Sequence, residues 1–131
     1  MKNKLLLIIF AYNVIAYCTI DQTLDTIRVV ESNNNSNLLY HADGVSFGLY
    51  GLTQLAIDEV ARIYGIKIVR VSKLKSLNFE RKYAKKYLEL MYKRYNCKDY
   101  IEASGYYHSK EINKRTNYIN KIRSKYDGKI L

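Results

Sequence analysis

The acid best placed to do chemistry in this sequence is Glu31, which ends an apolar turn (Val29-Val30) and is followed by Ser32. A polar run over residues 33–37 separates Glu31 from a loop with three glycines between positions 44 and 51. A carboxyl group that leaves a buried helix and faces such a loop can meet a low-polarity cleft on one side and water on the other. That environment makes a carboxyl group usable as a general acid near neutral pH. The alternative is that Glu31 only ends a fraying surface helix.

The other chemically active side chains form no cluster. The chain has two histidines, His41 and His108, and two cysteines, Cys18 and Cys97, all far apart in sequence. Two cysteines without a clustered histidine make a zinc site improbable, and each histidine is expected to be satisfied or exposed rather than a ligand. The sequence therefore predicts neither a metal site nor a cofactor.

The N-terminus is typical of an export signal. Basic residues at Lys2 and Lys4 precede an unbroken apolar run over Leu5–Phe10, and small residues at Val14 and Ala16 fit a cleavage site. We therefore predict a signal peptide over residues 1–16 and a mature domain over residues 17–131, in the periplasm or cell envelope. The stretch is short for a membrane span. The alternative is an apolar first helix of the domain.

Export would change the chemistry of the cysteines. Outside the cytosol, Cys18 and Cys97 could form a disulfide. In a lipoprotein, Cys18 would instead be acylated, which would anchor the protein to a membrane and leave Cys97 alone. Both alternatives stay open at the level of sequence.

Length and composition predict one globular domain with an anionic partner. The 131 residues are 48% hydrophobic and 26% charged, with a net charge of +10. Such a charge on an exported protein favours a cell wall, an outer leaflet or an extracellular polymer as partner. Nucleic acid is the competing partner, because the segment from Lys82 to Tyr107 mixes lysines and tyrosines. The tyrosines have the spacing of a helix core, so we expect no nucleic-acid binding.

The hydrophobic pattern, without any proline, predicts an all-α domain. In the first half we expect a short helix from Leu24 to Glu31 with Asp21 or Thr23 as its N-cap, followed by a loop over residues 32–51. A second helix should run over Thr53–Tyr64 and end at Gly65. The run 66–71 alternates like a strand, but no second strand exists for it to pair with, so we expect a connector.

In the second half, the longest helix is expected over Asn78–Tyr95. Asp99 should cap a further helix that runs to about Tyr107. A last helix should place Tyr118 and Tyr126 on one face and end at Gly128. No internal repeat or linker interrupts this order.

Several of these residues resemble the soluble lytic transglycosylase domain, which has a lysozyme-like helical fold. In that family a Glu-Ser pair ends a helix, and a glycine-rich loop with Gly-Leu-Met-Gln begins the next. Here Glu31-Ser32 is followed by Gly48-Leu49-Tyr50-Gly51-Leu52-Thr53-Gln54, with Thr53 in place of the usual methionine. Downstream, Tyr106-Tyr107-His108-Ser109 and Tyr118 lie where the family has a tyrosine element and a later tyrosine. The resemblance covers about Leu24 to Tyr126, and the three motifs occur in the family's order.

The resemblance implies roles for individual residues. Glu31 matches the catalytic acid/base, and Gln54 matches the glutamine that lines the saccharide cleft. Tyr107 matches the tyrosine that faces the catalytic glutamate from a distant helix.

Three further residues are implied as substrate-binding. Ser46 matches, with a displacement of one position, the serine ahead of the glycine loop, and Gly48 belongs to that loop. Ser32 follows the acid as in the family. The alternative for Ser32 is a helix-terminal hydroxyl that bonds to the backbone.

The resemblance implies a monomeric peptidoglycan lytic transglycosylase that cleaves the MurNAc–GlcNAc bond and forms a 1,6-anhydro product with a single carboxyl group. The expected partner is the peptidoglycan glycan strand. A hydrolytic muramidase is the first alternative, with Asp43 holding a water opposite Glu31. The second alternative is a non-catalytic domain that binds the cell wall or nucleic acid.

Overall fold

The computed structural model describes residues 19–74 and 77–130. The predicted signal peptide, its cleavage site and Cys18 lie outside the described residues. Within them the chain is all-helical, which confirms the predicted class. The helices are α2 (Ile20–Ser32), α3 (Gln54–Tyr64), α4 (Leu77–Arg94), α5 (Tyr100–His108) and α6 (Ile112–Ile130), with a short 3₁₀ turn at Val71–Lys73. None of these helices combines the length and the apolar character that a membrane span requires.

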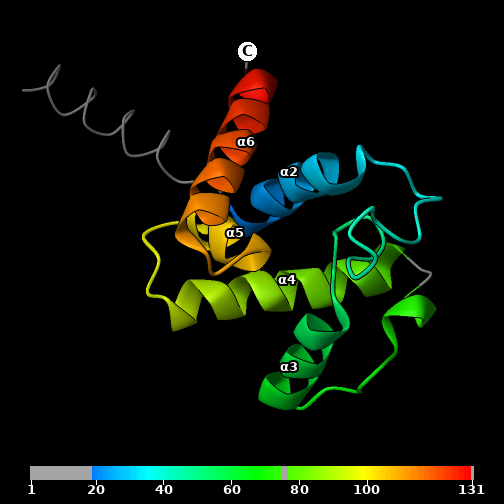
Figure 1. Ribbon diagram of the computed structural model, residues 1–131. Helices are drawn as coiled ribbons and strands as arrows, with labels where there is room; N and C mark the ends of the chain where they lie inside the picture. Colours follow the sequence, from blue (N-terminus) through cyan, green and yellow to red (C-terminus); the bar gives the residue numbers. More distant parts are fainter. Residues whose placement is uncertain (1–18, 75–76, 131) are drawn as a thin grey trace, which may run out of the picture.

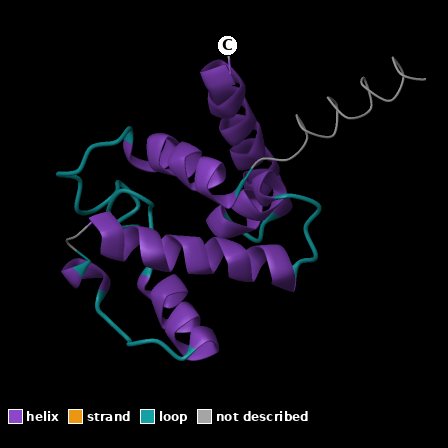
Figure 2. Cartoon of the chain, turned by 180° about the vertical axis from the view of Figure 1, so that it is seen from behind, coloured by secondary structure: helices purple, strands orange, loops and turns teal. Residues whose placement is uncertain are grey.

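Helix α4 is the element that joins the two sides of the domain. Figure 1 shows α3 on one side of α4 and α2, α5 and α6 on the other, and Figure 2 shows the same arrangement from behind. Helix α4 packs against α2, α3 and α5, while α6 packs against α2 and α5. Each helix contributes fully or nearly fully buried side chains to one core: Leu24 and Ile27, Ile57 and Val60, Leu88 and Met91, Ala103, and Ile122.

Helix α2 begins earlier than the sequence suggested. Its N-cap is Thr19, and neither Asp21 nor Thr23, so that prediction was wrong. The Thr19 hydroxyl accepts a hydrogen bond from the Gln22 backbone N–H, and the Gln22 side chain accepts one from the Thr19 N–H. This reciprocal capping box satisfies two backbone donors at the helix start. The Asp21 carboxylate is instead paired with Arg81 on α4.

The predicted boundaries of α3 are confirmed. The Thr53 hydroxyl accepts from the Ala56 N–H, and Gly65 ends the helix in the left-handed conformation at φ 64°. The run after Gly65 forms no strand up to the 3₁₀ turn at Val71, as expected for a connector.

The later helices are confirmed in order but not in every detail. Helix α6 has 19 residues and α4 has 18, so the prediction that the helix over Asn78–Tyr95 is the longest was wrong. Asp99 caps α5 through its side chain, as predicted. Helix α6 starts at Ile112 and continues past Gly128, so the predicted end at Gly128 was wrong. A glycine inside a helix costs only about 1 kcal/mol relative to alanine, which does not by itself end a helix.

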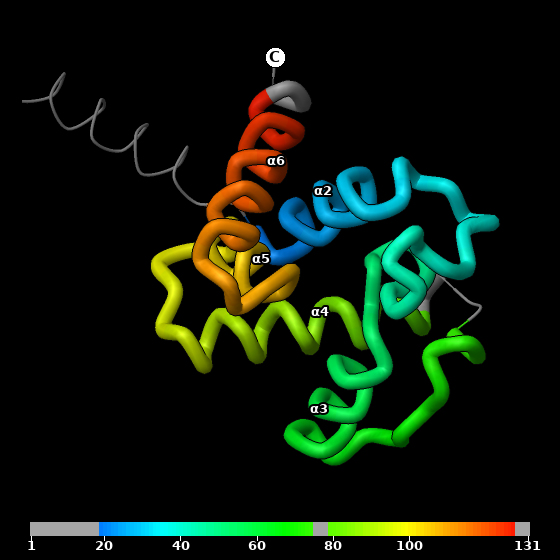
Figure 3. The backbone as a smooth tube through the Cα atoms, viewed as in Figure 1, coloured from blue at the N-terminus to red at the C-terminus, as the bar shows by residue number. Residues whose placement is uncertain are grey.

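The loop between α2 and α3 folds back onto the domain. In Figure 3 it leaves the end of α2, extends outward and then curls back beside α4 before α3 begins. Isolated bridges from Phe47 to Tyr40 and to Leu52 hold this curl together. Phe47, Tyr50 and Leu52 are almost fully buried, so the loop is anchored by its own side chains. The site is built on this anchored segment.

Candidate active site

Glu31 lies in the last turn of α2 with its carboxyl group against the glycine loop. The side chain is only 14% exposed. The loop approaches so closely at Gly51 that a Cβ there would lie 2.7 Å from Cδ and Oε2 of Glu31. Gly51 also has φ 62°, a backbone conformation that residues with a side chain rarely adopt. The loop can therefore reach the carboxyl group only because position 51 is a glycine.

Tyr118 holds one oxygen of this carboxyl group. Its hydroxyl donates a 2.8 Å hydrogen bond to Oε1 of Glu31. Burial, and then the charge of Glu31, raise the pKa of Tyr118 well above its usual value. The phenol therefore stays protonated as a donor. The contact brings α6 to the end of α2.

Both histidines lie beside the same carboxyl group. Nδ1 of His41 is 3.6 Å from Oε2 of Glu31, and Nδ1 of His108 is 3.7 Å from Oε1. The His108 ring also stacks on the Tyr118 ring with centroids 4.2 Å apart. The sequence predicted no site role for either histidine, and nothing in their spacing from Glu31 signals this proximity.

Tyr107 shares the cavity with Glu31 but uses its hydroxyl elsewhere. The hydroxyl donates a 2.8 Å hydrogen bond to the backbone carbonyl of Tyr50 in the glycine loop. The ring packs edge-on against Tyr87 of α4. Burial, and secondarily the charge of Glu31, raise the pKa of Tyr107 well above its usual value. The tyrosine whose hydroxyl contacts Glu31 is thus Tyr118.

Asp43 and Ser46 form a tight turn on the loop side of the cavity. The Asp43 carboxylate accepts hydrogen bonds from the Val45 N–H, the Ser46 N–H and the Ser46 hydroxyl. These bonds, the Ser46 hydroxyl first, lower the pKa of Asp43 to about 2. Asp43 is therefore an ionised carboxylate at neutral pH. It lines the same cavity as Glu31.

Gln54 lies at the start of α3 and holds the connector. Its amide nitrogen donates to Asp58 one turn later and to the backbone carbonyl of Val69, and its amide oxygen accepts from the Val71 N–H. Gln54 does not line the cavity beside Glu31. All of these polar contacts are with the chain itself.

Ser32 and Gly48 also lie outside the cavity lining. The Ser32 hydroxyl is buried and donates to the Arg28 carbonyl, the backbone contact that was its alternative role. Gly48 has φ 72°, and a Cβ there would collide with the buried carboxyl group of Glu80. Its carbonyl oxygen lies 2.7 Å from Nε2 of His41.

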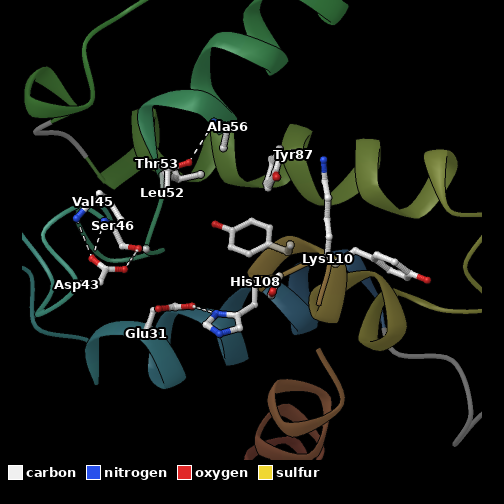
Figure 4. A pocket seen from close by; sticks show the side chains of 14 residues that line it. Glu31, Asp43, Val45, Ser46, Leu52, Thr53, Ala56, Tyr87, His108 and Lys110 are labelled. Atoms are coloured by element: carbon white, nitrogen blue, oxygen red, sulfur yellow. Dashed lines mark hydrogen bonds and ion pairs between the residues drawn. The ribbon is translucent and has the colours of Figure 1, made fainter. Parts of the chain in front are cut away.

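The cavity has a volume of about 320 Å³, within the range of about 300–1,000 Å³ typical of small-molecule sites. Its lining includes Glu31 from α2, Asp43 and Ser46 from the loop, and His108 and Lys110 from the end of α5 and the turn after it. Figure 4 shows Glu31 and His108 pointing toward one another, with Asp43 and Ser46 beside them. Of the predicted site residues, the structure brings Glu31, Ser46 and Tyr107 into this cavity.

The cysteine predictions stay open. Cys97 is buried, and its thiol donates to the Met91 carbonyl at 3.7 Å. Burial raises its pKa to about 11, which makes the thiol unreactive at neutral pH. Its predicted partner Cys18 lies outside the described residues. Among the residues that the structure describes, no group of three or more His, Cys, Asp or Glu side chains could hold a metal ion.

The arrangement can perform acid–base chemistry. The largely buried carboxyl group of Glu31 has a hydroxyl donor on one oxygen and an imidazole beside the other, and an ionised second carboxylate lines the same cavity. Comparison with known proteins finds no matching family model, curated protein or solved structure.

Proposed function

We propose that this chain is a peptidoglycan lytic transglycosylase with a lysozyme-like fold and Glu31 as its acid/base. The observation that carries the proposal is the position of the Glu31 carboxyl group. It lines the cavity, lies against Gly51 and accepts a hydrogen bond from the Tyr118 hydroxyl. The motif resemblance supports the same residue independently. The proposed partner is a glycan strand of the cell envelope, bound by an exported monomer.

The reaction needs one carboxyl group that first gives and then takes a proton. Protonated Glu31 donates to the glycosidic oxygen between N-acetylmuramic acid and N-acetylglucosamine, and the bond breaks. The N-acetyl oxygen of the substrate stabilises the oxocarbenium-like centre. Ionised Glu31 then takes the proton of the C6 hydroxyl, whose oxygen closes the 1,6-anhydro ring. Protons balance over the cycle, and no water is consumed.

Two tyrosines, Tyr118 and Tyr107, position this carboxyl group and the glycine loop. Tyr118 fixes Oε1, so the side chain is oriented before substrate arrives. Tyr107 ties the loop to α5 through the Tyr50 carbonyl, which keeps Gly51 against Glu31. Net positive charge favours approach to an anionic wall polymer.

A hydrolytic muramidase is the second candidate, and Asp43 is the observation that favours it. An ionised carboxylate in the same cavity could act as base for a water opposite the acid. The two candidates differ in product: hydrolysis leaves a reducing sugar end, whereas transglycosylation leaves an anhydro end lighter by one water.

Digestion of purified peptidoglycan, followed by mass spectrometry of the released sugars, tests the proposal. We expect anhydro ends from the wild type and a loss of ~10² to 10⁴-fold in turnover for Glu31→Gln, because the acid/base is removed. The matched control is Glu89→Gln on α4, outside the cavity lining, which should keep wild-type turnover. Reducing ends would favour the muramidase, and no released sugar from a folded wild type would favour the non-catalytic binding domain.

A further inference from the structure

A second groove lies between the end of α2 and one face of α6. Figure 1 shows these two helices side by side, with the C-terminal part of α6 extending beyond α2. The α2–α6 groove has a volume of about 850 Å³, within the range of about 300–1,000 Å³ typical of ligand sites. It shares no lining residue with the cavity of Glu31, so it is a separate site.

The wall that α6 contributes to this groove is polar and exposed. The buried face of the same helix is formed by Tyr118 and Ile122, so the core does not need the groove face. The groove residues follow one another at steps of three, one, three and one positions, which is the spacing of a single helix face. They are Asn117, Asn120, Lys121, Ser124 and Lys125, and all five are exposed.

The charge of this wall is positive and uncompensated. Helix α6 contains six basic residues and one acid, Asp127. Lys121 and Lys125 form no ion pair with any residue that the structure describes. No acid lines the groove, whereas Glu31 and Asp43 both line the other cavity. An anionic group in the groove would therefore meet two ammonium groups and no carboxylate.

The remaining lining suits the hydroxyl groups and the apolar ring faces of sugars. The side chains of Asn33, Asn117 and Asn120 form no hydrogen bond with the described part of the chain. Each of these amides offers donors and an acceptor, which matches a hydroxyl group that both donates and accepts. Half-buried Val29 and Val30 give the groove an apolar floor against which the C–H face of a sugar ring can pack.

The dimensions and composition of the groove favour a sugar chain over other anions. The α6 wall from Asn117 to Lys125 is about 12 Å long at 1.5 Å per residue, which is longer than a single small anion needs. The lining contains no aromatic side chain on which nucleic-acid bases could stack. Its only apolar residues are the two valines, too few for an amphipathic membrane-binding face.

We propose that the α2–α6 groove binds an acidic polysaccharide, a sugar chain that carries carboxylate groups. Lys121 and Lys125 bind the carboxylates, and the three asparagine amides bind hydroxyl groups. The groove thereby holds the protein on such a polymer at a place other than the cavity of Glu31. The inference does not rest on the proposed function, because the two sites have no residue in common.

Titration of the ¹⁵N-labelled full chain with oligogalacturonate, which carries a carboxylate on each sugar, tests the inference. The side-chain amide signals of Asn33, Asn117 and Asn120 should shift on binding, and calorimetry should give a Kd that rises with salt concentration. Lys121→Gln/Lys125→Gln should raise this Kd at least ~10-fold, because two contacts to charged groups are lost.

The matched control is Lys82→Gln/Lys93→Gln. Both lysines are exposed on α4 and lie outside the groove, and their replacement removes the same charge. The control should keep the Kd within ~2-fold, since distant exposed charges are screened by salt. Equal losses of affinity in the two pairs would show that overall charge alone binds the polymer, and would overturn the inference.

A third pair separates recognition of hydroxyl groups from recognition of charge. Asn117→Ala/Asn120→Ala should raise the Kd for oligogalacturonate at least ~5-fold and leave the Kd for inorganic polyphosphate unchanged, because polyphosphate has charge but no sugar hydroxyls. A neutral galactose oligomer should not shift the groove amides, because it has no group for the lysines.

Three results contradict the assignment to an acidic polysaccharide. The first is saturation with oligogalacturonate without any shift of the groove amides, or no binding at all. The second is tighter binding of polyphosphate or of single-stranded DNA than of oligogalacturonate at equal charge. The third is equal binding of the neutral oligomer. None of these measurements involves cleavage of peptidoglycan, so failure of the proposed function would leave their outcome standing.

Discussion

The hydroxyl of Tyr118 donates a 2.8 Å hydrogen bond to Oε1 of Glu31, across 87 residues of sequence. The contact joins α6 to the last turn of α2, two helices that pack against each other. The same phenol ring stacks on His108, which also lies beside Oε1. One aromatic side chain thus orients both the carboxyl group and its neighbouring imidazole.

Removal of that hydroxyl should affect activity more than folding. Tyr118→Phe keeps the ring and its stacking on His108. We expect turnover of peptidoglycan to fall ~10-fold or more, because Oε1 of Glu31 loses the donor that orients it. The free energy of unfolding should fall by only ~1 to 3 kcal/mol, the cost of a hydrogen bond to a carboxylate. Kinetics and urea unfolding measure the two effects.

The control for Tyr118→Phe is Tyr92→Phe. The Tyr92 ring stacks on Tyr100 and does not line the cavity. Its hydroxyl should be dispensable for turnover. Full turnover in Tyr118→Phe would contradict the orienting role of Tyr118.

Two glycines offer a matched test of how closely the loop approaches Glu31. Gly51 and Gly65 have nearly the same φ, 62° and 64°, but a Cβ at 51 would lie 2.7 Å from the Glu31 carboxyl carbon, whereas one at 65 would meet nothing within 4 Å. Gly65→Ala should cost ~1 kcal/mol of stability from backbone strain and keep activity. Gly51→Ala carries the same strain and must also displace Glu31.

We therefore expect Gly51→Ala to lose most of its turnover in the fraction that remains folded. Thermal unfolding and specific activity of the two variants are compared side by side. Equal losses of activity in Gly51→Ala and Gly65→Ala would show that backbone strain alone is responsible.

The Asp43 turn predicts an acid-dependent part of the stability. The pKa of Asp43 is lowered from 3.8 to about 2 in the folded chain, chiefly by the Ser46 hydroxyl. A depressed folded pKa contributes stability that is present above the unfolded pKa of 3.8 and is lost as pH falls toward 2. Melting temperatures of wild type and Asp43→Asn, measured over this window, should converge as the pH falls.

Ser46→Ala is the partner experiment to Asp43→Asn. Loss of the hydroxyl donor should move the acid-dependent loss of stability to higher pH, because the Asp43 carboxylate keeps only its backbone donors. A constant difference between wild type and Asp43→Asn at every pH would rule out the perturbed carboxylate as its cause.

Local signals explain why much of the helical order could be predicted. The end of α3 and the start of α5 depend on residues next to the helix ends, and they were identified from Gly65 and Asp99. The start of α2 was missed because Thr19 and Gln22 form a capping box just before the apolar pattern begins. The end of α6 was placed wrongly at Gly128 because a glycine often ends a helix, whereas here the helix continues through it.

The surroundings of Glu31 could be predicted only in part. The glycine loop is close in sequence, so its role was accessible from the spacing. His41, His108 and Tyr118 reach Glu31 through the packing of the loop and of α5 and α6 on α2, which no local pattern specifies. Gln54 was expected in the cleft. Its side-chain amide instead forms hydrogen bonds with the Asp58 carboxylate one turn later and with the backbone of Val69 and Val71 in the connector.

In the proposed reaction, the Glu31 carboxyl group gives the proton that breaks the glycosidic bond and takes the proton released when the anhydro ring closes. The most direct measurement is the yield of anhydro sugar ends released from purified peptidoglycan by wild type and by Glu31→Gln, at equal concentrations of folded protein. We expect abundant anhydro ends from the wild type and at least ~10²-fold fewer from the variant. Equal yields from the two proteins would contradict it.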